Sequence, residues 1–480
     1  MKKNNSIYIV SFFEGAAVMA TELCGSKLIS PYFGSSLYVW ASVIAITLGS
    51  LAAGYFFGGR LSLKADRVQI LRLILALSAV YMGFMPIITN AFAPIALGFS
   101  LITAVVLSSI LLLVLPMFLM GAASPVIISI QAENSNESGR VSGLVYSVST
   151  VGGIISTFLC GFYFIPSFGI STTLIIFGSL LLLSLLLILQ KKSPFKILVF
   201  LLLLIVLGFT NKTPLKNCIY ERDGMLGKLN VIDDTMNGRV IRKLLVNNVV
   251  QSEMDLQTKN SVSQYVAILD SNIGSGSQKT AAVLGLGGGL TSNLLVKKGF
   301  TVVGVELDGR IIAAAYKYFD MDKNVYTVCD DARHFMNVYQ EKYSVILVDL
   351  FKAEEQPWHV LTTESLEKIK EILASDGQLI INWHGYIEGE RGLGTSVLLN
   401  TLEKSGFQYK IAAASDKEDE RNLVIFAGIK APVLKQFEIK PAVQPIALVN
   451  SDDHPVLEKY NALANQSWRK NYILYYYSGY

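Results

Sequence analysis

Cysteine and histidine are scarce in this chain, each occurring four times among 480 residues. No two cysteines have the spacing of a metal site or a disulfide framework, and neither an HExxH segment nor a Ser/His/Asp order is present. These absences argue against a zinc protease, a triad hydrolase and a disulfide-stapled scaffold. We expect no metal, and any catalysis should depend on carboxylates acting with a bound reactive cofactor. Structural or surface roles are expected for the four histidines, His334, His359, His384 and His454.

Charged residues are also scarce, but only in the first 210 residues. That part holds 11 basic and 5 acidic side chains, against 30 and 32 in the remaining 270 residues. The contrast predicts a membrane region followed by a soluble region. Their net charges of +6 and −2 leave no strongly basic surface, so we expect a lipid bilayer and no nucleic acid as a partner.

Six apolar runs are long enough to cross a bilayer as helices. The first lacks a convincing cleavage site and exceeds the length of a signal-peptide core, so we interpret it as a retained helix. The fourth contains 37 residues, too many for one straight crossing, and we predict a break at Pro116, Gly121 or Pro125. The runs lie near residues 7–29, 37–59, 69–90, 94–130, 141–164 and 171–189.

Lysine and arginine predict the orientation of these helices, because cytoplasmic loops are enriched in both. Basic residues precede the first run, follow the second and follow the sixth, whereas the loops between the other ends contain none. The N-terminus and residues 190–196 are therefore predicted to be cytoplasmic. Glu14 and Glu22 lie two turns apart on the first helix. They are either functional intramembrane acids or structural ones that are hydrogen-bonded within the bundle or near its ends.

Short alternating strands follow residue 214. The segments KLNVID, RVIRKLLV and VVQSEM alternate, and Asn247-Asn248 has the composition of a tight hairpin turn. We predict three domains: a multi-pass membrane domain at 1–210, a small β domain at 211–261 and a Rossmann-like α/β domain with a C-terminal tail at 262–480. In the last, a helix at 363–373 and a strand at 378–383 continue the sheet, and a later αβ unit ends in the strand NLVIFAGI.

The segment from Ala281 to Asp349 carries the clearest functional pattern. A strand enters the glycine-rich turn GLGGG, and the next strands end on Glu306, on Asp330-Asp331 and on Asp349. Doubly wound sheets bind ligands at the carboxyl ends of their strands. Glycines let the backbone approach a ligand, and an acid after the second strand can accept ribose hydroxyls, so we predict a site for an adenosine-containing cofactor.

Residues 197–209 leave two alternatives for the side of the membrane on which this site lies. A full seventh crossing would export the soluble part, and an interfacial or re-entrant segment would keep it in the cytoplasm. Adenosyl cofactors are cytoplasmic metabolites, and we therefore favour the second alternative.

The chain resembles the membrane-fused spermidine synthase-like proteins of the polyamine aminopropyltransferase family. Matching segments are found in both halves of the chain, and the resemblance covers nearly all of it. In the membrane part they are SPYFGSSLYVWASVIAITLGSLAAGYFFGGRLS and LPMFLMGAASPVI. In the soluble part they are VNNVVQSEMD, VLGLGGG, VVGVELDGRII, VCDDARHFM, VDLFKAEEQPWHVLTTESL and SDDHPVLE.

The resemblance implies a class I methyltransferase fold and a binding site for S-adenosylmethionine or its decarboxylated form. It places the cofactor over Gly285, Gly287 and Gly289, its ribose on Glu306, and its adenine beside Asp331 and Ala332. Asp349 falls where the family has the acid beside the reacting amine, and Gln251 and Tyr265 fall where it lines the substrate cleft. A carboxylate there has a purpose, because a protonated amine must lose a proton before it can attack carbon.

Two departures from the family pattern concern the amine site. The family has an acid within the glycine-rich turn, at the position we match to Gly288. It also has a second acid three residues after the position of Asp349, which is Lys352 here. Glu354 or Glu355 could supply the missing negative charge, depending on the geometry of the loop.

Three functions therefore remain open from the sequence. The first is a membrane-bound transferase that moves an aminopropyl group from decarboxylated S-adenosylmethionine to a polyamine such as putrescine. The second is an S-adenosylmethionine-dependent methyltransferase with an unknown acceptor. The third is a non-catalytic sensor or transporter-like membrane protein that binds an adenosyl ligand. A homo-oligomer is compatible with the sequence, which does not define the oligomeric state.

Overall fold

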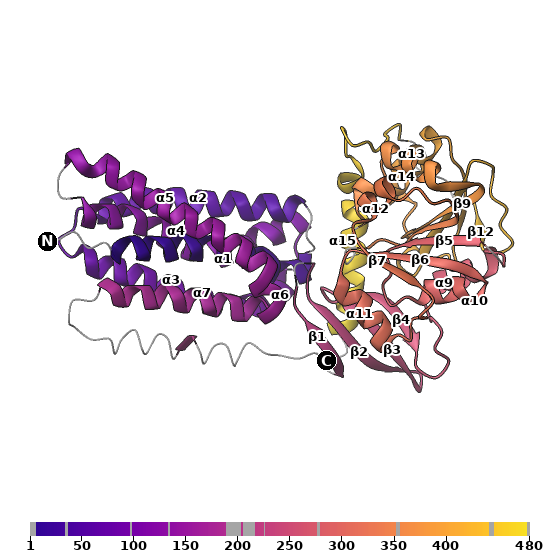
Figure 1. Cartoon of the computed structure of the whole chain (residues 1–480), viewed down its shortest axis with the longest axis horizontal. Coiled ribbons are helices and arrows are strands. Elements are labelled where there is room, and N and C mark those ends of the chain that lie inside the picture. Colours follow the sequence, from indigo (N-terminus) through magenta and orange to yellow (C-terminus); the bar gives the residue numbers. More distant parts are fainter. Residues whose placement is uncertain are drawn as a thin grey trace. The chain divides into compact units, whose positions relative to one another are not determined.

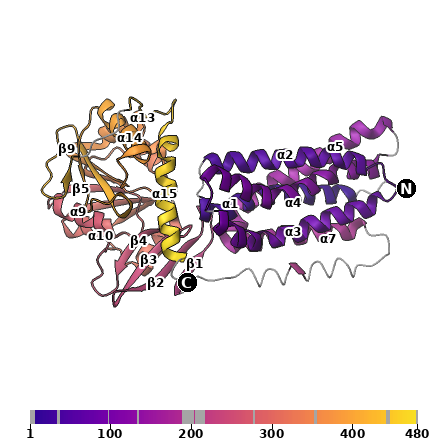
Figure 2. The same ribbon diagram turned by 180° about the vertical axis from the view of Figure 1, so that it is seen from behind.

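The computed structural model forms two compact units. One comprises Met1–Pro214 and Arg222–Lys228, the other Leu215–Glu221 and Leu229–Tyr480. Each unit is described by itself below (Figures 1 and 2). The structure describes all residues except 1–5, 34–36, 97, 133–134, 189–202, 205–216, 225, 276–278, 352–355, 441–445 and 478–480.

The first unit is a bundle of long apolar helices. Within its described residues, six helices are long and apolar enough to cross a membrane, which confirms the six predicted runs. They are formed by α1 (Ser6–Phe33), α2 (Leu37–Leu61), α3 (Arg67–Ala96), α4 (Leu101–Gln131), α5 (Ser135–Leu159) with the π-turn Cys160–Phe164 and α6 (Ile165–Phe168), and α7 (Ile170–Ser184) with the 3₁₀ turn Leu185–Ile188.

The predicted break in the fourth run is wrong. Helix α4 is continuous over 31 residues, with Pro116 and Pro125 inside it. The run is shorter than the sequence indicated because residues 94–96 belong to α3. Prolines are tolerated inside membrane helices when neighbouring helices and local adjustments satisfy the freed backbone groups.

Small residues allow the helices of the bundle to approach closely. A Cβ atom at Gly58 of α2 would lie 2.5 Å from the carbonyl oxygen of Ala122 in α4, and one at Gly121 would lie 2.7 Å from that of Leu51. Hydroxyl groups join other helices, since Ser156 of α5 donates a hydrogen bond of 2.7 Å to the carbonyl of Ala16 in α1. Close packing and interhelical hydrogen bonds are the interactions that associate helices in lipid, where the hydrophobic effect does not.

The two acids of α1 differ in their surroundings. Glu14 is buried, and its Oε2 accepts a hydrogen bond of 3.0 Å from the hydroxyl of Ser149 in α5. Glu22 is only partly buried. Glu14 is thus hydrogen-bonded within the bundle, as the structural alternative expects.

Residues Arg222–Lys228 belong to the same unit as the helix bundle. The carboxylate of Asp223 lies against Gly169, directly before the start of α7. Leu185–Ile188 lie at the opposite end of that helix. The predicted membrane segment 197–209 falls outside the described residues, apart from 203 and 204.

A small antiparallel sheet opens the second unit, with the strand order β1-β2-β3-β4. Its strands are β1 (Cys218–Arg222), β2 (Leu229–Met236), β3 (Arg239–Val246) and β4 (Val249–Asp255). The predicted hairpin is confirmed, because Asn247 and Asn248 both have positive φ, as a two-residue turn with the twist of the strands requires. Leu229, Val231 and Leu244 of this sheet pack against α10 and α11.

The larger sheet has eight strands in the order β12-β10-β11-β9-β8-β5-β6-β7. Strands β7, β6, β5, β8 and β9 are parallel, whereas β11 is antiparallel to β9, and β10 to β11. They are β5 (Lys279–Leu284), β6 (Phe300–Glu306), β7 (Tyr326–Cys329), β8 (Tyr343–Val348), β9 (Leu373–His384), β10 (Gln408–Ala412), β11 (Asn422–Gly428) and β12 (Glu438–Ile439). This order, with an antiparallel pair beside the last parallel strand, is the class I methyltransferase fold that the sequence predicted.

Helices cover both faces of this sheet (Figure 1). One apolar core joins it to α12 (Ala332–Val338), α13 (Thr363–Ile372) and α14 (Leu393–Lys404), and another joins it to α9 (Gln264–Asn272), α10 (Leu290–Lys297) and α11 (Gly309–Tyr318). The C-terminal helix α15 (Leu457–Tyr477) completes the unit. The predicted helix at 363–373 and strand at 378–383 are confirmed, but β10 was not anticipated. The domain boundaries at 210 and 261 stay a prediction.

Candidate active site

The glycine-rich turn after β5 depends on backbone conformations that other residues rarely adopt. Gly285, Gly287 and Gly289 have φ values of 91°, 51° and 74°. Gly285 also packs against the carbonyl oxygen of Asp349, leaving no room for a side chain. Gly289 precedes the first residue of α10 in a left-handed conformation. The turn after β5 and the strand end after β8 are thus in direct backbone contact.

Glu306, the last residue of β6, faces this turn. Its Oε2 accepts a hydrogen bond of 3.2 Å from the backbone N–H of Leu286, and its Oε1 accepts one of 3.0 Å from Asp308. Burial raises the pKa of Glu306, while these backbone donors act in the opposite direction. The carboxylate is therefore fixed at the strand end and retains lone pairs that can accept further hydrogen bonds.

Asp331 follows β7 and caps helix α12. Its Oδ1 accepts hydrogen bonds from the backbone N–H groups of Arg333 and His334, and its Oδ2 lies 3.4 Å from Nε2 of His359. The contact with His359 lowers the pKa of Asp331. Ala332 is buried as the first residue of the helix.

These residues fit an adenosyl group in chemistry and in order. They stand at the carboxyl ends of β5, β6 and β7, which are adjacent in the sheet. The sheet order reverses between β5 and β8, and doubly wound sheets bind ligands outside such a point. The sequence predicted three groups for this role. They are the glycine turn, the carboxylate of Glu306 for the ribose hydroxyls, and Asp331 one strand further on.

Asp349 lies on the other side of that reversal, immediately after β8. Tyr265 of α9 donates a hydrogen bond of 2.9 Å to its Oδ2, and Asn382 of β9 donates one of 2.8 Å to its Oδ1. Asn422 of β11 in turn donates to Oδ1 of Asn382 at 3.0 Å. Burial raises the pKa of Asp349, and the two donors act against this by stabilising the carboxylate. Neutral groups from three elements therefore hold the orientation of this acid.

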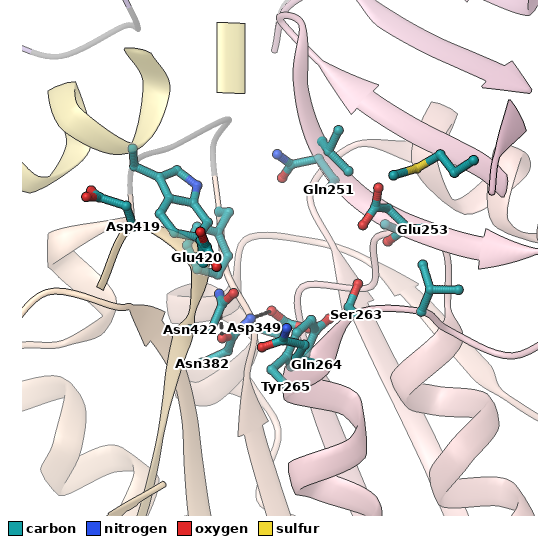
Figure 3. A pocket seen from close by; sticks show the side chains of 16 residues that line it. Gln251, Glu253, Ser263, Gln264, Tyr265, Asp349, Asn382, Asp419, Glu420 and Asn422 are labelled. Carbon is teal, nitrogen blue, oxygen red and sulfur yellow. Dashed lines mark hydrogen bonds between the residues drawn. The ribbon is translucent and has the colours of Figure 1, made fainter. Parts of the chain in front are cut away.

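A cavity of about 660 Å³ opens above Asp349 (Figure 3). It brings together the three residues that the sequence assigned to the acceptor, Gln251, Tyr265 and Asp349. The residues assigned to the adenosyl group lie at neighbouring strand ends but do not line this cavity. Its full lining comprises Met236, Val250, Gln251, Ser252, Glu253, Val262, Ser263, Gln264, Tyr265, Asp349, Phe351, Asn382, Asp419, Glu420, Asn422 and Trp468.

Three further acids in this lining escaped sequence reasoning. Figure 3 shows Glu253 of β4 on one side of the cavity, and Asp419 and Glu420, from the 3₁₀ turn Glu418–Glu420, on the other. None of the sixteen described lining residues is a lysine or arginine. Glu253 is two residues from Gln251, but the register of β3 and β4 shifts at Gln251, so strand alternation did not mark Glu253 as a lining residue. No local pattern marks the turn at 418–420 as part of a site.

Basic residues outside the lining partly balance these acids. Nζ of the buried Lys243 lies 3.5 Å from Glu253, and Arg391 donates to Asp419 at 2.8 Å. Lys417 lies 2.9 Å from Glu420. Among the contacts described for Asp349, by contrast, the partners are neutral.

The sequence departs from the family pattern at Gly288 and Lys352, and the structure describes only the first of these. Gly288 does not line the cavity, and a Cβ atom there would lie 3.0 Å from both Ser252 Cβ and Phe319 Cδ1. A side chain at 288 would therefore require these neighbours to shift by a few tenths of an ångström. Lys352, Glu354 and Glu355 lie outside the described residues. Glu253, Asp419 and Glu420 bring negative charge to the cavity from other elements, partly balanced by their basic partners.

The geometry places a glycine turn and strand-end acids next to an acid-lined cavity on a methyltransferase-like sheet. Among the described residues, no group of three or more His, Cys, Asp and Glu side chains is placed to hold a metal ion.

Two relatives match parts of this chain. The chain is 33% identical over 156 residues to the N-terminal histidine N-methyltransferase of Emericella nidulans, covering 30% of this chain and 27% of that protein. It is 26% identical over 120 residues to the probable polyamine aminopropyl transferase of Bifidobacterium longum, covering 25% of this chain and 27% of that protein. The chain thus matches about a quarter of the length of each. No family model matches the chain.

Among solved structures, a probable spermidine synthase from Corynebacterium glutamicum is similar, with 18% sequence identity and a TM-score of 0.37. The match covers 45% of this chain and 80% of that one. The relatives of this chain therefore include a methyltransferase and a probable polyamine aminopropyl transferase, and both are transferases.

Proposed function

We propose that this protein is a membrane-bound transferase that moves an aminopropyl group from decarboxylated S-adenosylmethionine to an amine such as putrescine. The observation that carries the proposal is the position of Asp349. Its backbone contacts the glycine-rich turn, and its carboxylate faces a cavity with three further acids and no basic residue among its described lining. Such a cavity favours a cationic acceptor and places it beside the adenosyl side of the sheet.

On the adenosyl side, the chain would bind the co-substrate through Glu306, Asp331 and the glycine turn. Glu306 would accept hydrogen bonds from the ribose hydroxyls with its remaining lone pairs, while Asp331 and Ala332 would lie beside the adenine. Decarboxylated S-adenosylmethionine would supply a carbon next to a sulfonium, which leaves as a neutral thioether. Charge-assisted hydrogen bonds of the kind that Glu306 can form are stronger than those between neutral groups.

On the acceptor side, Asp349 would act as the base. An amine is protonated at neutral pH, so its nitrogen has no free lone pair until a proton is removed. Asp349 would take that proton, and the freed nitrogen would form a bond to the aminopropyl carbon as the carbon–sulfur bond breaks. Tyr265 and Asn382 would hold the carboxylate in the orientation that this transfer needs.

A second candidate is methyl transfer from intact S-adenosylmethionine to an amine. The similarity to an N-terminal histidine N-methyltransferase favours it, and the same base and cavity could serve it. The third candidate, adenosyl-ligand binding without catalysis, would leave Asp349 and its hydrogen-bond partners without a chemical role.

We further propose that the first unit lies in a lipid bilayer and that the transfer site faces the cytoplasm, where adenosyl co-substrates are made. Six helices of spanning length and composition support the bilayer, and the distribution of lysine and arginine supports a cytoplasmic N-terminus.

The products of the purified full-length protein in lipid nanodiscs test the proposal. The protein is supplied with putrescine and either decarboxylated or intact S-adenosylmethionine, and adenosyl products are separated by chromatography and mass. Methylthioadenosine formed with spermidine is the expected result. S-adenosylhomocysteine alone would overturn aminopropyl transfer in favour of methyl transfer. Neither product, with adenosyl binding retained in calorimetry, would support the non-catalytic alternative.

A further inference from the structure

The C-terminal helix α15 contributes a wall to the acceptor cavity, although it follows the last strand of the sheet by many residues. Its Trp468 lines the cavity together with Asp349, Phe351 and Asn422. The indole is almost entirely buried, with 6% of the residue exposed. A large side chain from the end of the chain thus helps to define the space above the proposed base.

Ring contacts fix the orientation of this indole. The ring centroids of Trp468 and His384 are 5.2 Å apart, and those of His384 and Phe351 are 5.5 Å apart. Tyr386 packs edge-on against Trp468 at 6.5 Å. Buried rings in contact with one another have few alternative rotamers, so the indole presents a defined surface.

Polar contacts fix the helix itself at three points. Asn461 donates a hydrogen bond of 3.0 Å to Oε1 of Gln356, and Oδ1 of Asn465 lies 2.8 Å from Nε2 of His384. One turn further on, Arg469 donates a hydrogen bond of 3.1 Å to the carbonyl of Asn247, in the β3–β4 turn. The helix is therefore held to the α/β sheet and to the small sheet at once. The distance between Trp468 and Asp349 is set by the folded unit.

The chemistry of the wall suggests what it recognises. Carboxylates alone attract any cation, including a small hydrated one. An indole adds apolar area for a methylene chain and a ring face that attracts alkylammonium groups. Asp419 and Glu420 line the same cavity, so the wall combines aromatic and anionic groups.

We infer that Trp468 is a specificity-determining residue that selects amine acceptors by the length of their aliphatic chain. The inference rests on the proposed function. The indole contacts the part of the acceptor that lies away from the reacting nitrogen, while Asp349 contacts that nitrogen. Because both positions are fixed, acceptors of one length satisfy both contacts better than shorter or longer ones.

The test measures amine binding by the full-length protein in nanodiscs, in the presence of methylthioadenosine. The probes are 1,3-diaminopropane, putrescine, cadaverine and spermidine, titrated by calorimetry into the unchanged protein and into Trp468→Phe, Trp468→Leu and Trp468→Ala. Leu463→Ala is the matched control, since Leu463 is exposed on the same helix. Circular dichroism and thermal unfolding verify the fold of each variant.

We expect Trp468→Ala to weaken binding of the preferred amine roughly three- to thirty-fold, the range of a cation–aromatic contact, and to reduce the differences between the four amines. Trp468→Phe should retain most of the affinity, and Leu463→Ala all of it. In turnover assays, the effect of Trp468→Ala should be in KM for the amine, with kcat largely preserved. If Trp468→Ala does not fold, the amine affinities of Trp468→Leu and Trp468→Phe are compared instead. Only phenylalanine keeps a ring face, so the leucine variant should bind the preferred amine more weakly.

Two contrary results are distinguishable. Equal affinities and equal length preference in the unchanged protein and the folded tryptophan variants would overturn the inference while leaving the proposed function intact. Failure of the unchanged protein to bind any of the four amines would overturn the proposed function, and this inference with it.

Discussion

Two hydrogen-bonded carboxylates, one buried in the helix bundle and one half-buried in the α/β unit, show how differently the two parts of this protein use an acid. Glu14 in the helix bundle accepts a hydrogen bond from Ser149 and sits where Gly15 packs against the backbone of α5. Asp349 in the α/β unit accepts two hydrogen bonds but faces a cavity of about 660 Å³. Burial alone therefore does not mark a reactive acid. Access for a substrate is what distinguishes Asp349.

The proposal that the acid-lined cavity lies on the cytoplasmic side of the membrane has an all-or-none test, which is the topology of the chain. Single cysteines at positions 193 and 270, in a background without the native cysteines, should both resist an impermeant thiol reagent in intact cells. Both should react after permeabilisation.

One contact within the first unit argues against the cytoplasmic placement, and the labelling experiment decides between the two. Asp223 lies against Gly169 at the start of α7, whereas residue 188 is at its end, a separation of about 28 Å along the helix axis. A chain that runs from residue 188 to Asp223 must cover that distance, and the thirteen residues 197–209 as a helix would account for about 20 Å of it. Labelling of position 270 in intact cells would show that crossing and would contradict a cytoplasmic site.

The largest expected effect on chemistry comes from Asp349→Asn. The amide has nearly the same shape but cannot accept a proton, so kcat should fall by about 10²–10⁴-fold, the usual contribution of a general base. Adenosyl binding, measured by calorimetry, should be preserved. Glu253→Gln is a matched control that neutralises another cavity acid, and it should affect mainly the KM for the amine. Turnover by Asp349→Asn close to that of the unchanged protein would exclude Asp349 as the base.

A smaller loss is expected on the adenosyl side. Glu306→Ala removes the carboxylate at the end of β6 and should weaken adenosyl binding by about 1.5–3 kcal/mol, the range for hydrogen bonds to charged groups. Titration with methylthioadenosine, which carries the same ribose, measures this without turnover. Unchanged affinity would remove Glu306 from the site.

A shift in pH dependence should result from Tyr265→Phe. The pKa of Asp349 is raised by burial, so the base is protonated and inactive at low pH, and kcat/KM should rise as pH increases through that pKa. The Tyr265 hydroxyl stabilises the charged carboxylate. Its removal should raise this pKa further and move the acidic limb of the profile to higher pH. If the acidic limb of the kcat/KM profile stays at the same pH in Tyr265→Phe, the profile reports the titration of a group other than Asp349.

The smallest effect on stability and activity is expected at Glu14, the acid of the helix bundle. Glu14→Gln keeps an oxygen that can accept the hydrogen bond from Ser149, so thermal stability should change by less than about 1 kcal/mol. Transfer rates should be unchanged, because the proposed site residues all belong to the other unit. A large loss of activity in a folded Glu14→Gln protein would mean that the bundle takes part in function.

Local rules were sufficient for much of this protein. Hydrophobic length predicted the six long helices, and Asn247-Asn248 predicted a turn whose positive φ values only a few residue types tolerate. The order of strand, glycine turn and acid predicted the adenosyl side of the sheet, since consecutive parallel strands place their carboxyl ends together. Each of these features is encoded within a few residues or one repeated pattern.

Only the tertiary structure decided the rest. The continuity of α4 depends on neighbours that accommodate Pro116 and Pro125 and on where α3 ends. Glu253, Asp419 and Trp468 come from a small sheet, a 3₁₀ turn and the C-terminal helix, and no local pattern relates them. They share a cavity because long-range packing brings distant segments together. The sequence alone thus predicted which strand ends carry the glycine turn and the acids, and the fold decided what surrounds Asp349.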